Sequence, residues 1–218
     1  MLDLTAARRQ MTTQQVRAWS ALDDEQLAVF DRLAREDFVP EAQRALAYAD
    51  LPVPLPCAQH MLQPSVVGRI VQAVKPTRSD QVLEIGTGSG YVSACLALLA
   101  GSVHSIEIHD ELAEFARGNL RQAGIGNVEL QTGDAFALIT AAPCYDIIVI
   151  TGSMPVYDAR FEAALKPGGR LYVVTGDAPA MQARLITQHS SGVRKEQSLF
   201  ETATDALVNA RRVNSFVF

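Results

Sequence analysis

The sequence predicts an α/β fold built around a mostly parallel sheet. From residue 81 onward, short apolar runs rich in β-branched residues alternate with amphipathic segments of helical spacing. Strands that alternate with helices form parallel sheets with helices on both faces. The first run, residues 81–85, is followed at once by Gly86, Gly88 and Gly90 and then by an apolar helical segment. Such a strand, glycine loop and helix let a ligand lie against bare backbone at a helix N-terminus.

The core elements are predicted in chain order from these periodicities. A helix is expected at residues 64–74, and strands at 81–85, 102–108, 127–131, 145–150 and 170–175, with helical segments at 91–99, 110–123 and 161–165 between them. Residues 151–155 are expected to be a loop and residues 180–189 a helix. Two last strands, 192–200 and 211–218, have no helix between them and are expected to pair as an antiparallel edge hairpin, which makes seven strands.

The chain before residue 64 shows helical but no strand periodicity. Residues 5–19 form one amphipathic candidate, and Asp23 or Asp24 can cap a second helix. A proline-rich stretch at 51–56 must be extended and stiff. We therefore expect residues 1–63 to form an N-terminal helical extension with a loop segment, and residues 64–218 to form the core domain.

The composition bounds the class of protein. The chain has 218 residues, of which 48% are hydrophobic and 20% charged, as in ordinary soluble globular proteins. A net charge of −5 argues against broad binding to nucleic acid. Neither a bilayer-spanning run nor a signal-peptide pattern is present, and three scattered cysteines show no metal or redox spacing. We expect a cytoplasmic protein with no metal site and no nucleic-acid or membrane partner.

Three acids decide which ligand the glycine loop favours. Glu84 stands just before the loop, Glu107 ends the second strand, and Asp134 follows the third. The spacing Gly-x-Gly-x-Gly differs from the dinucleotide pattern, and acids would repel a pyrophosphate but suit the positive sulfonium and ammonium of S-adenosylmethionine. Glu107 can accept both ribose hydroxyls and Asp134 the adenine amino group. Taken singly, Glu107 is compatible with a solvated acid, Asp134 with a helix N-cap and Glu84 with a loop cap.

The loop at residues 82–91 resembles the methyl-donor loop of the protein-L-isoaspartate (D-aspartate) O-methyltransferases. The resemblance continues in family order through segments 38–40, 47–52, 63–64, 127–128, 133–134, 146–149 and 166–171. It implies a class I, Rossmann-like, S-adenosylmethionine-dependent methyltransferase with a mostly parallel seven-stranded sheet. It also implies that the donor is held by Glu84, Gly86, Gly88, Glu107, Asp134 and Ala135. The predicted donor site further includes Thr87, Ser89, Gly90, Ile108, Gly133 and Thr151.

The departures from the family pattern fall on the acceptor side. Where the family has Gly-Gln-Thr-Ile-Ser, this chain has Ala-Gln-His-Met-Leu, so that Leu62 replaces the serine whose hydroxyl helps bind the substrate carboxylate. The loop at 151–155 and the strand end at 174–176 also differ from the family. The tentative substrate-loop positions are His60, Leu62 and Ser65, with Ser153 as a further hydroxyl. His60 is also consistent with a loop histidine without a role, and Ser65 with a first-turn helix residue.

Three functions remain open at this point. The first is a divergent isoaspartyl methyltransferase that methylates the carboxylate of isoaspartyl residues in damaged proteins or peptides, a protein-repair activity. A carboxylate is already ionised near neutral pH, so no general base is required. The second is a methyltransferase for a different, unknown small acceptor, and the third is a donor-binding protein without catalysis. A nicotinamide enzyme is a distant fourth, and the pattern leaves monomer and homodimer open.

Overall fold

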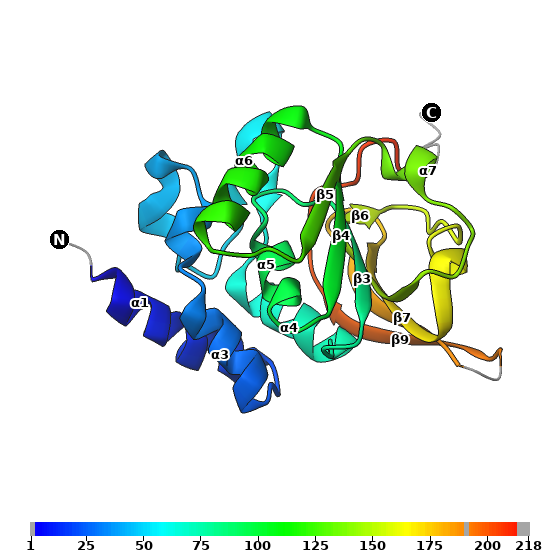
Figure 1. Cartoon of the computed structure of the whole chain (residues 1–218), viewed down its shortest axis with the longest axis horizontal. Helices are drawn as coiled ribbons and strands as arrows, with labels where there is room; N and C mark the ends of the chain where they lie inside the picture. The colour runs from blue at the N-terminus through cyan, green and yellow to red at the C-terminus, as the bar shows by residue number, and fades with distance from the viewer. Residues whose placement is uncertain (1–2, 190–191, 213–218) are drawn as a thin grey trace.

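The strands from β3 onward form one seven-stranded sheet in the order β5-β4-β3-β6-β7-β8-β9. The computed structural model describes residues 3–189 and 192–212 (Figure 1). The sheet strands are β3 (Gln81–Ile85), β4 (Ser102–Glu107), β5 (Val128–Thr132), β6 (Tyr145–Met154), β7 (Leu165–Thr175), β8 (Gln182–Gln188) and β9 (Arg194–Glu201). The pairs from β5 to β7 are parallel, and β7–β8 and β8–β9 are antiparallel. The predicted mostly parallel sheet with an antiparallel edge is confirmed.

The order of the strands reverses at β3, which lies between β4 and β6. In an open α/β sheet, the carboxyl ends of the strands leave a crevice at such a switch point, and ligands bind there. β3 begins as predicted at Gln81 and ends at Ile85, and its last four residues are buried. The glycine loop (residues 86–90) therefore starts inside this crevice.

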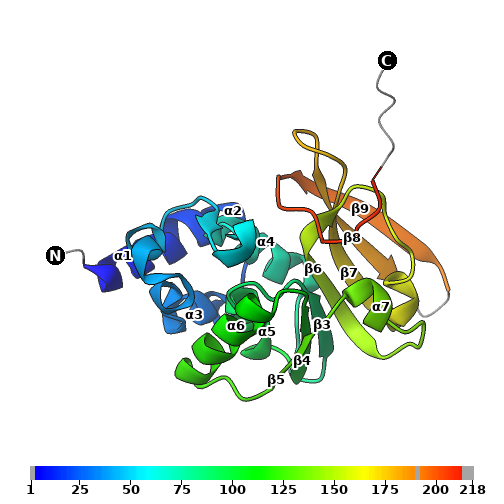
Figure 2. The same ribbon diagram turned by 90° about the horizontal axis from the view of Figure 1, so that it is seen from above.

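One face of the sheet is covered by α4 (Pro64–Val74), α5 (Tyr91–Ala97) and α6 (Asp110–Gln122). The N-terminal helices lie beyond these three (Figure 2); they are α1 (Leu4–Gln10), the π-helical η1 (Met11–Val16), α2 (Arg17–Trp19) and α3 (Asp24–Arg32). Asp23 caps α3 and forms a capping box with Gln26, as the sequence predicts. No helix among residues 3–189 and 192–212 is long and apolar enough to cross a bilayer.

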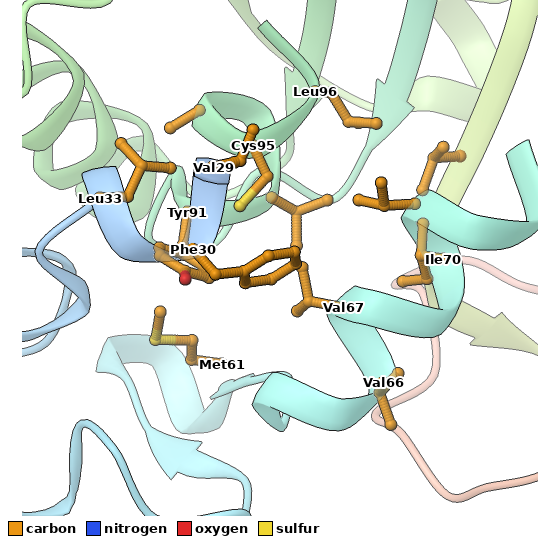
Figure 3. Packing of buried hydrophobic residues seen from close by; sticks show 14 of the residues in the cluster. Val29, Phe30, Leu33, Met61, Val66, Val67, Ile70, Tyr91, Cys95 and Leu96 are labelled. Atoms are coloured by element: carbon orange, nitrogen blue, oxygen red, sulfur yellow. The ribbon is translucent and has the colours of Figure 1, made fainter. Parts of the chain in front are cut away.

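The N-terminal helices share one hydrophobic core with the sheet domain. Phe30 of α3, Val67 of α4 and Tyr91 of α5 belong to the same buried cluster. Figure 3 shows these side chains and that of Met61 pointing toward one another. The division between residues 1–63 and 64–218 remains a prediction, and the shared core implies that the two parts fold together.

The opposite face of the sheet carries little helix. It is covered by α7 (Ala135–Leu138), the 3₁₀ turn η5 (Glu162–Ala164) and the intervening loop, whose Phe161 is buried in a second apolar cluster. The predicted helix at 161–165 is thus only a short turn. The expectation of helices on both faces holds in full for one face and only in part for the other.

The C-terminal third departs most from the sequence prediction. Residues 180–189 were expected to be helical, but β8 pairs antiparallel with β7 from Thr175↔Gln182 to Arg170↔Thr187. Pairing with a central strand overrides local helical propensity. The edge hairpin is consequently β8–β9, and the predicted strand at 211–218 lies outside the described residues from 213 on. Residues 151–155 were expected to be a loop, but residues 151–154 continue β6, which ends at Met154.

Between the N-terminal helices and α4 lies a short irregular segment. It contains the 3₁₀ turns η2 (Arg35–Phe38), η3 (Glu41–Leu46) and η4 (Pro56–Ala58) and the two-residue strands β1 (Val53–Pro54) and β2 (His60–Met61). β1 and β2 pair antiparallel, and we call residues 53–63 the β1–β2 segment.

Arg35 holds the β1–β2 segment in place from inside the protein. This fully buried side chain donates from Nε to the carbonyl of Ala47 (2.7 Å) and from Nη2 to the carbonyl of Leu62 (2.6 Å). Its guanidinium also lies over the Tyr91 ring, 4.8 Å from the centroid. Burial lowers the pKa of Arg35. The guanidinium therefore joins the β1–β2 segment to the first turn of α5.

After β9 the chain turns back across the carboxyl end of β6. We call residues 202–210 the strap. The backbone N–H of Ser153 donates to Asp205 O (2.8 Å), and that of Leu207 donates to Ser153 O (2.9 Å), with a parallel bridge between Ser153 and Ala206. The strap runs beside β6 and α7 in both views (Figures 1 and 2).

Candidate functional site

The cavity at the switch point has four walls. They are the glycine loop, the ends of β4 and β6 with the turn before α7, the β1–β2 segment, and the strap. The space measures about 860 Å³, including its open mouth. The cavity therefore lies where the strand order predicts a ligand.

The glycine loop has a backbone that only glycine adopts easily. Gly86 has φ +90° and Gly88 has φ +55°. A residue with a side chain adopts such angles only with backbone strain. A Cβ on Gly86 would lie 2.5 Å from Thr151 Oγ1, and that hydroxyl donates to Gly86 O (2.5 Å) and Ile85 O (2.9 Å). Thr151, predicted as a site residue, thus fixes the loop and also lines the cavity.

Glu107 is fixed at the end of β4 with its carboxylate against the cavity. Its Oε2 accepts the backbone N–H of Gly88 (2.8 Å), and its Oε1 accepts that of His109 (3.0 Å). The residue is only 4% exposed. Two neutral backbone donors leave lone pairs on both oxygens, so this carboxylate can still accept a pair of ligand hydroxyls.

Asp134 has the capping geometry that the sequence left open, and it also lines the cavity. As N-cap of α7, its Oδ1 accepts the N–H of Phe136 (2.9 Å). Its Oδ2 accepts from Asn209 Nδ2 of the strap (3.0 Å). The predicted neighbours Ile108, Gly133 and Ala135 line the same wall.

Glu84 does not line the cavity, contrary to the expectation that all three acids face the ligand. It is fully buried beneath the glycine loop, where its Oε2 accepts from Ser93 and from Ser105 (2.6 Å). Ser105 in turn contacts the hydroxyl of Thr87 (2.6 Å). Desolvation raises the pKa of Glu84 to about 7, against the hydrogen bonds from the two serines. The chain from Glu84 through Ser105 to Thr87 supports the loop from below.

The acceptor-side candidates separate into two groups. His60 and Leu62 line the cavity, whereas Ser65 does not. The backbone N–H of Ser65 donates to Asp50 Oδ1 (3.1 Å). Ser153 is fully buried, and its hydroxyl points to the strap carbonyls of Thr204 (3.3 Å) and Asp205 (3.4 Å). Gly90 also lies outside the cavity wall, as the N-cap of α5.

His60 lies against the strap. Its Nδ1 is 3.0 Å from Asp205 Oδ2, and the two side chains are 44% and 38% exposed. This pair joins the β1–β2 segment to the strap across the cavity. Leu62 has no polar group to offer there, and it packs against the main core cluster.

The strap was not predicted from the sequence. Thr204, Asp205, Ala206, Leu207 and Val208 all line the cavity, although residues 202–210 contain no motif. Their position depends on pairing with Ser153, about fifty residues earlier in the chain. Polar residues between two predicted strands were the only signal, and such residues are common in loops.

The part of the chain that the structure describes contains no group of three or more His, Cys, Asp or Glu side chains that could hold a metal ion. Cys57, Cys95 and Cys144 are free, and Cys95 is buried.

Known proteins resemble this chain over nearly its whole length. A family model described as protein-L-isoaspartate(D-aspartate) O-methyltransferase matches residues 7–209. A protein-L-isoaspartate O-methyltransferase of Rhodopseudomonas palustris is 36% identical over 201 residues, which are 92% of each chain. Another, of Koribacter versatilis, is 34% identical over 185 residues, covering 85% of this chain and 83% of its own.

Solved structures share the fold at lower identity. A putative protein-L-isoaspartate O-methyltransferase of Plasmodium falciparum, solved in complex with S-adenosyl-L-homocysteine, superimposes with a TM-score of 0.78 at 16% identity, covering 95% of this chain and 99% of its own. A second structure named protein-L-isoaspartate O-methyltransferase also has a TM-score of 0.78, at 23% identity, but this chain spans only 65% of its length. With the family model and the two relatives above, the conclusion is that this chain belongs to the protein-L-isoaspartate (D-aspartate) O-methyltransferase family.

Proposed function

We propose that the chain transfers the methyl group of S-adenosylmethionine to the carboxylate of L-isoaspartyl residues in damaged proteins. Family membership makes the chain an S-adenosylmethionine-dependent methyltransferase that acts on protein. The observation that carries the proposal is the position of Glu107 and Asp134 at the ends of neighbouring strands, beside the glycine loop and facing one cavity that reaches the β1–β2 segment.

The residues of the cavity fit the donor. An added Cβ on Gly88 would contact only Leu55, at 3.5 Å, so its bare backbone leaves room for a ligand to approach. Glu107 would accept the two ribose hydroxyls, and Asp134 with Ala135 would border the adenine. Asp134 can accept a hydrogen bond from the adenine and still cap α7, because each carboxylate oxygen has a second lone pair. The donor supplies a methyl group bound to a positively charged sulfur.

The reaction does not require a general base from the protein. The acceptor carboxylate is ionised near neutral pH, so its oxygen can take the methyl group while the sulfur keeps the electron pair of the broken bond. The residues of the cavity must therefore align the acceptor oxygen with the methyl group and exclude water. The strap and the β1–β2 segment, which meet at His60 and Asp205, are the walls available for that task.

A methyl-transfer assay tests this proposal. The full-length chain is supplied with labelled S-adenosylmethionine and either an isoaspartyl peptide or its aspartyl twin. Label transferred to the isoaspartyl peptide alone is the expected result. Donor binding with transfer to neither peptide would contradict it and would favour a different acceptor.

We also propose that the protein works in the cytoplasm. Three free cysteines, one of them buried and two exposed, suit a reducing compartment. Cell fractionation with an antibody against the chain tests this location, and recovery from an oxidising compartment would contradict it.

A further inference from the structure

We infer that His60 is the residue that binds the acceptor carboxylate, in place of the family serine, and that Asp205 positions its ring. The inference rests on the proposed function and names the group that recognises the substrate. It starts from the charges around the cavity.

The cavity wall is poor in positive charge. Glu107, Asp134 and Asp205 all line it, whereas no lysine or arginine among the described residues does. An anionic acceptor entering beside three carboxylates needs a cationic or hydrogen-bonding partner, because like charges repel at short range. Only His60 and His109 among the lining side chains can carry a positive charge.

His109 belongs to the donor side. It follows β4 directly, and its backbone N–H is bonded to Glu107 Oε1 (3.0 Å), the acid assigned to the ribose. Its Nε2 is buried away from solvent. His60 lies on β2, across the cavity, and is partly open to solvent at the mouth, where a peptide arrives. The positions of the two histidines therefore assign His109 to the donor side and His60 to the acceptor side.

His60 is positioned by its paired backbone and by one contact to its ring. Its backbone is fixed by β1–β2 pairing opposite Pro54 and by the adjacent Leu55 N–H to Gln59 O bond (2.8 Å). Its Nδ1 is held by Asp205 (3.0 Å), whose own backbone is bonded to Ser153. A carboxylate on Nδ1 leaves Nε2 for another partner. In the protonated ring, that nitrogen is an N–H donor with a full positive charge nearby.

His60 also lies close to position 62, where the family pattern has a serine hydroxyl. His60, Met61 and Leu62 all line the cavity. Met61 is buried and packs in the core (Figure 3), and His60 is the one of the three whose side chain can donate a hydrogen bond. Because Leu62 offers no donor, and Ser65 and Ser153 are turned elsewhere, His60 is the group next to the position of the lost serine.

Kinetics of position variants test the assignment. We compare the full-length wild type with His60→Ala, Asp205→Asn and the double variant, using an isoaspartyl peptide as acceptor. Loss of a hydrogen bond to a charged group is expected to raise the peptide KM about 10- to 100-fold in His60→Ala. kcat and the affinity for S-adenosyl-L-homocysteine are expected to stay close to the wild type. Asp205→Asn should raise KM less, and should add nothing in the His60→Ala background, as expected of a positioning residue.

A matched histidine and a binding measurement complete the design. His189→Ala removes an exposed histidine of the β8–β9 turn that is not part of the cavity wall, and its constants should match those of the wild type. Peptide binding in the presence of S-adenosyl-L-homocysteine should weaken about 10- to 100-fold in His60→Ala and stay unchanged in His189→Ala.

The outcomes separate this inference from the proposed function. A wild type that methylates the isoaspartyl peptide, with an unchanged KM in His60→Ala, overturns the role of His60 alone. A fall in kcat at constant KM also overturns it, because the ring would then act as a base for a protic acceptor. A wild type that neither methylates nor binds the peptide overturns the proposed function, and the assignment of His60 with it.

Discussion

The donor side of the cavity is formed mainly by backbone groups, and the acceptor side by exposed side chains. On the donor side, the backbone dominates: the glycine loop has positive φ angles, and Glu107 is bonded to two backbone N–H groups and is 4% exposed. On the acceptor side, the contact across the cavity is made by two side chains, His60 and Asp205, which are 44% and 38% exposed.

This difference explains how a fold can retain its cofactor site while the residues of its substrate site change. A site made of backbone depends on turn geometry and tolerates few replacements. A site made of exposed side chains can change one residue at a time, because neighbouring elements do not need to move. The donor and acceptor halves should therefore respond separately to substitution, and the following predictions test that separation.

The largest expected effect is on donor binding in Glu107→Ala. If Glu107 binds the ribose as proposed, removal of the carboxylate takes away hydrogen bonds to both hydroxyls, each worth about 1.5–3 kcal/mol with a charged acceptor. The affinity for S-adenosyl-L-homocysteine should fall by about 100-fold or more, as measured by calorimetry, while isolated peptide binding is retained.

Glu114→Ala is the matched control for Glu107→Ala. Glu114 is an exposed acid of α6 that pairs with Arg117, so its loss should leave donor affinity unchanged. Equal affinities for all three proteins would mean that the ribose does not lie beside Glu107.

Gly86→Ala should damage the donor half through the backbone. The strained φ costs about 1–2 kcal/mol, and overpacking against Thr151 adds about 1–3 kcal/mol, since the new Cβ would lie 2.5 Å from Oγ1. The free energy of unfolding, from urea denaturation, should fall by about 2–5 kcal/mol. Gly124→Ala isolates the strain, because Gly124 has φ +69° but no neighbour within 4 Å. Equal losses in both variants would remove the close approach of Thr151 as a cause.

Glu84 should make the donor half sensitive to pH. Its pKa of about 7 in the folded protein exceeds the value of 4.5 for a free side chain, so the folded state binds the extra proton between these values. Stability from this group is present below pH 4.5 and is lost as pH rises to about 7. Over that window, the wild type should lose about 3 kcal/mol more than Glu84→Gln, which stays uncharged. Parallel stability curves for the two proteins would show that the pKa of Glu84 is not raised in the folded protein.

The smallest effect is expected on the acceptor side in Leu62→Ser. A restored hydroxyl should lower the KM for an isoaspartyl peptide by about 10-fold and leave the donor affinity unchanged. Leu62→Ala is the control, because it makes the same truncation without a hydroxyl. If both variants have the same KM, the hydroxyl at this position does not reach the acceptor.

The sequence predicted the donor half better than the acceptor half for physical reasons. The helix at 64–74 and the strand at 81–85 were placed to the residue, because proline, glycine and apolar periodicity act locally. Glu84 was expected in the cavity because the pattern shows its place before the loop but not the direction of its side chain. β8 and the strap could not be found, because each depends on pairing with a distant strand.

The contact of Arg35 with the β1–β2 segment has a consequence for evolvability. Arg35 holds this segment through the carbonyl oxygen of Leu62 and binds the carbonyl oxygen of Ala47, which precedes the segment. A carbonyl is the same in every amino acid. Selection can therefore exchange the side chain at position 62, and the one at position 60, without moving the backbone that carries them. Replacement of serine by leucine at position 62 is the kind of change that this anchoring permits, and substrate preference can drift while the fold and the donor site stay constant.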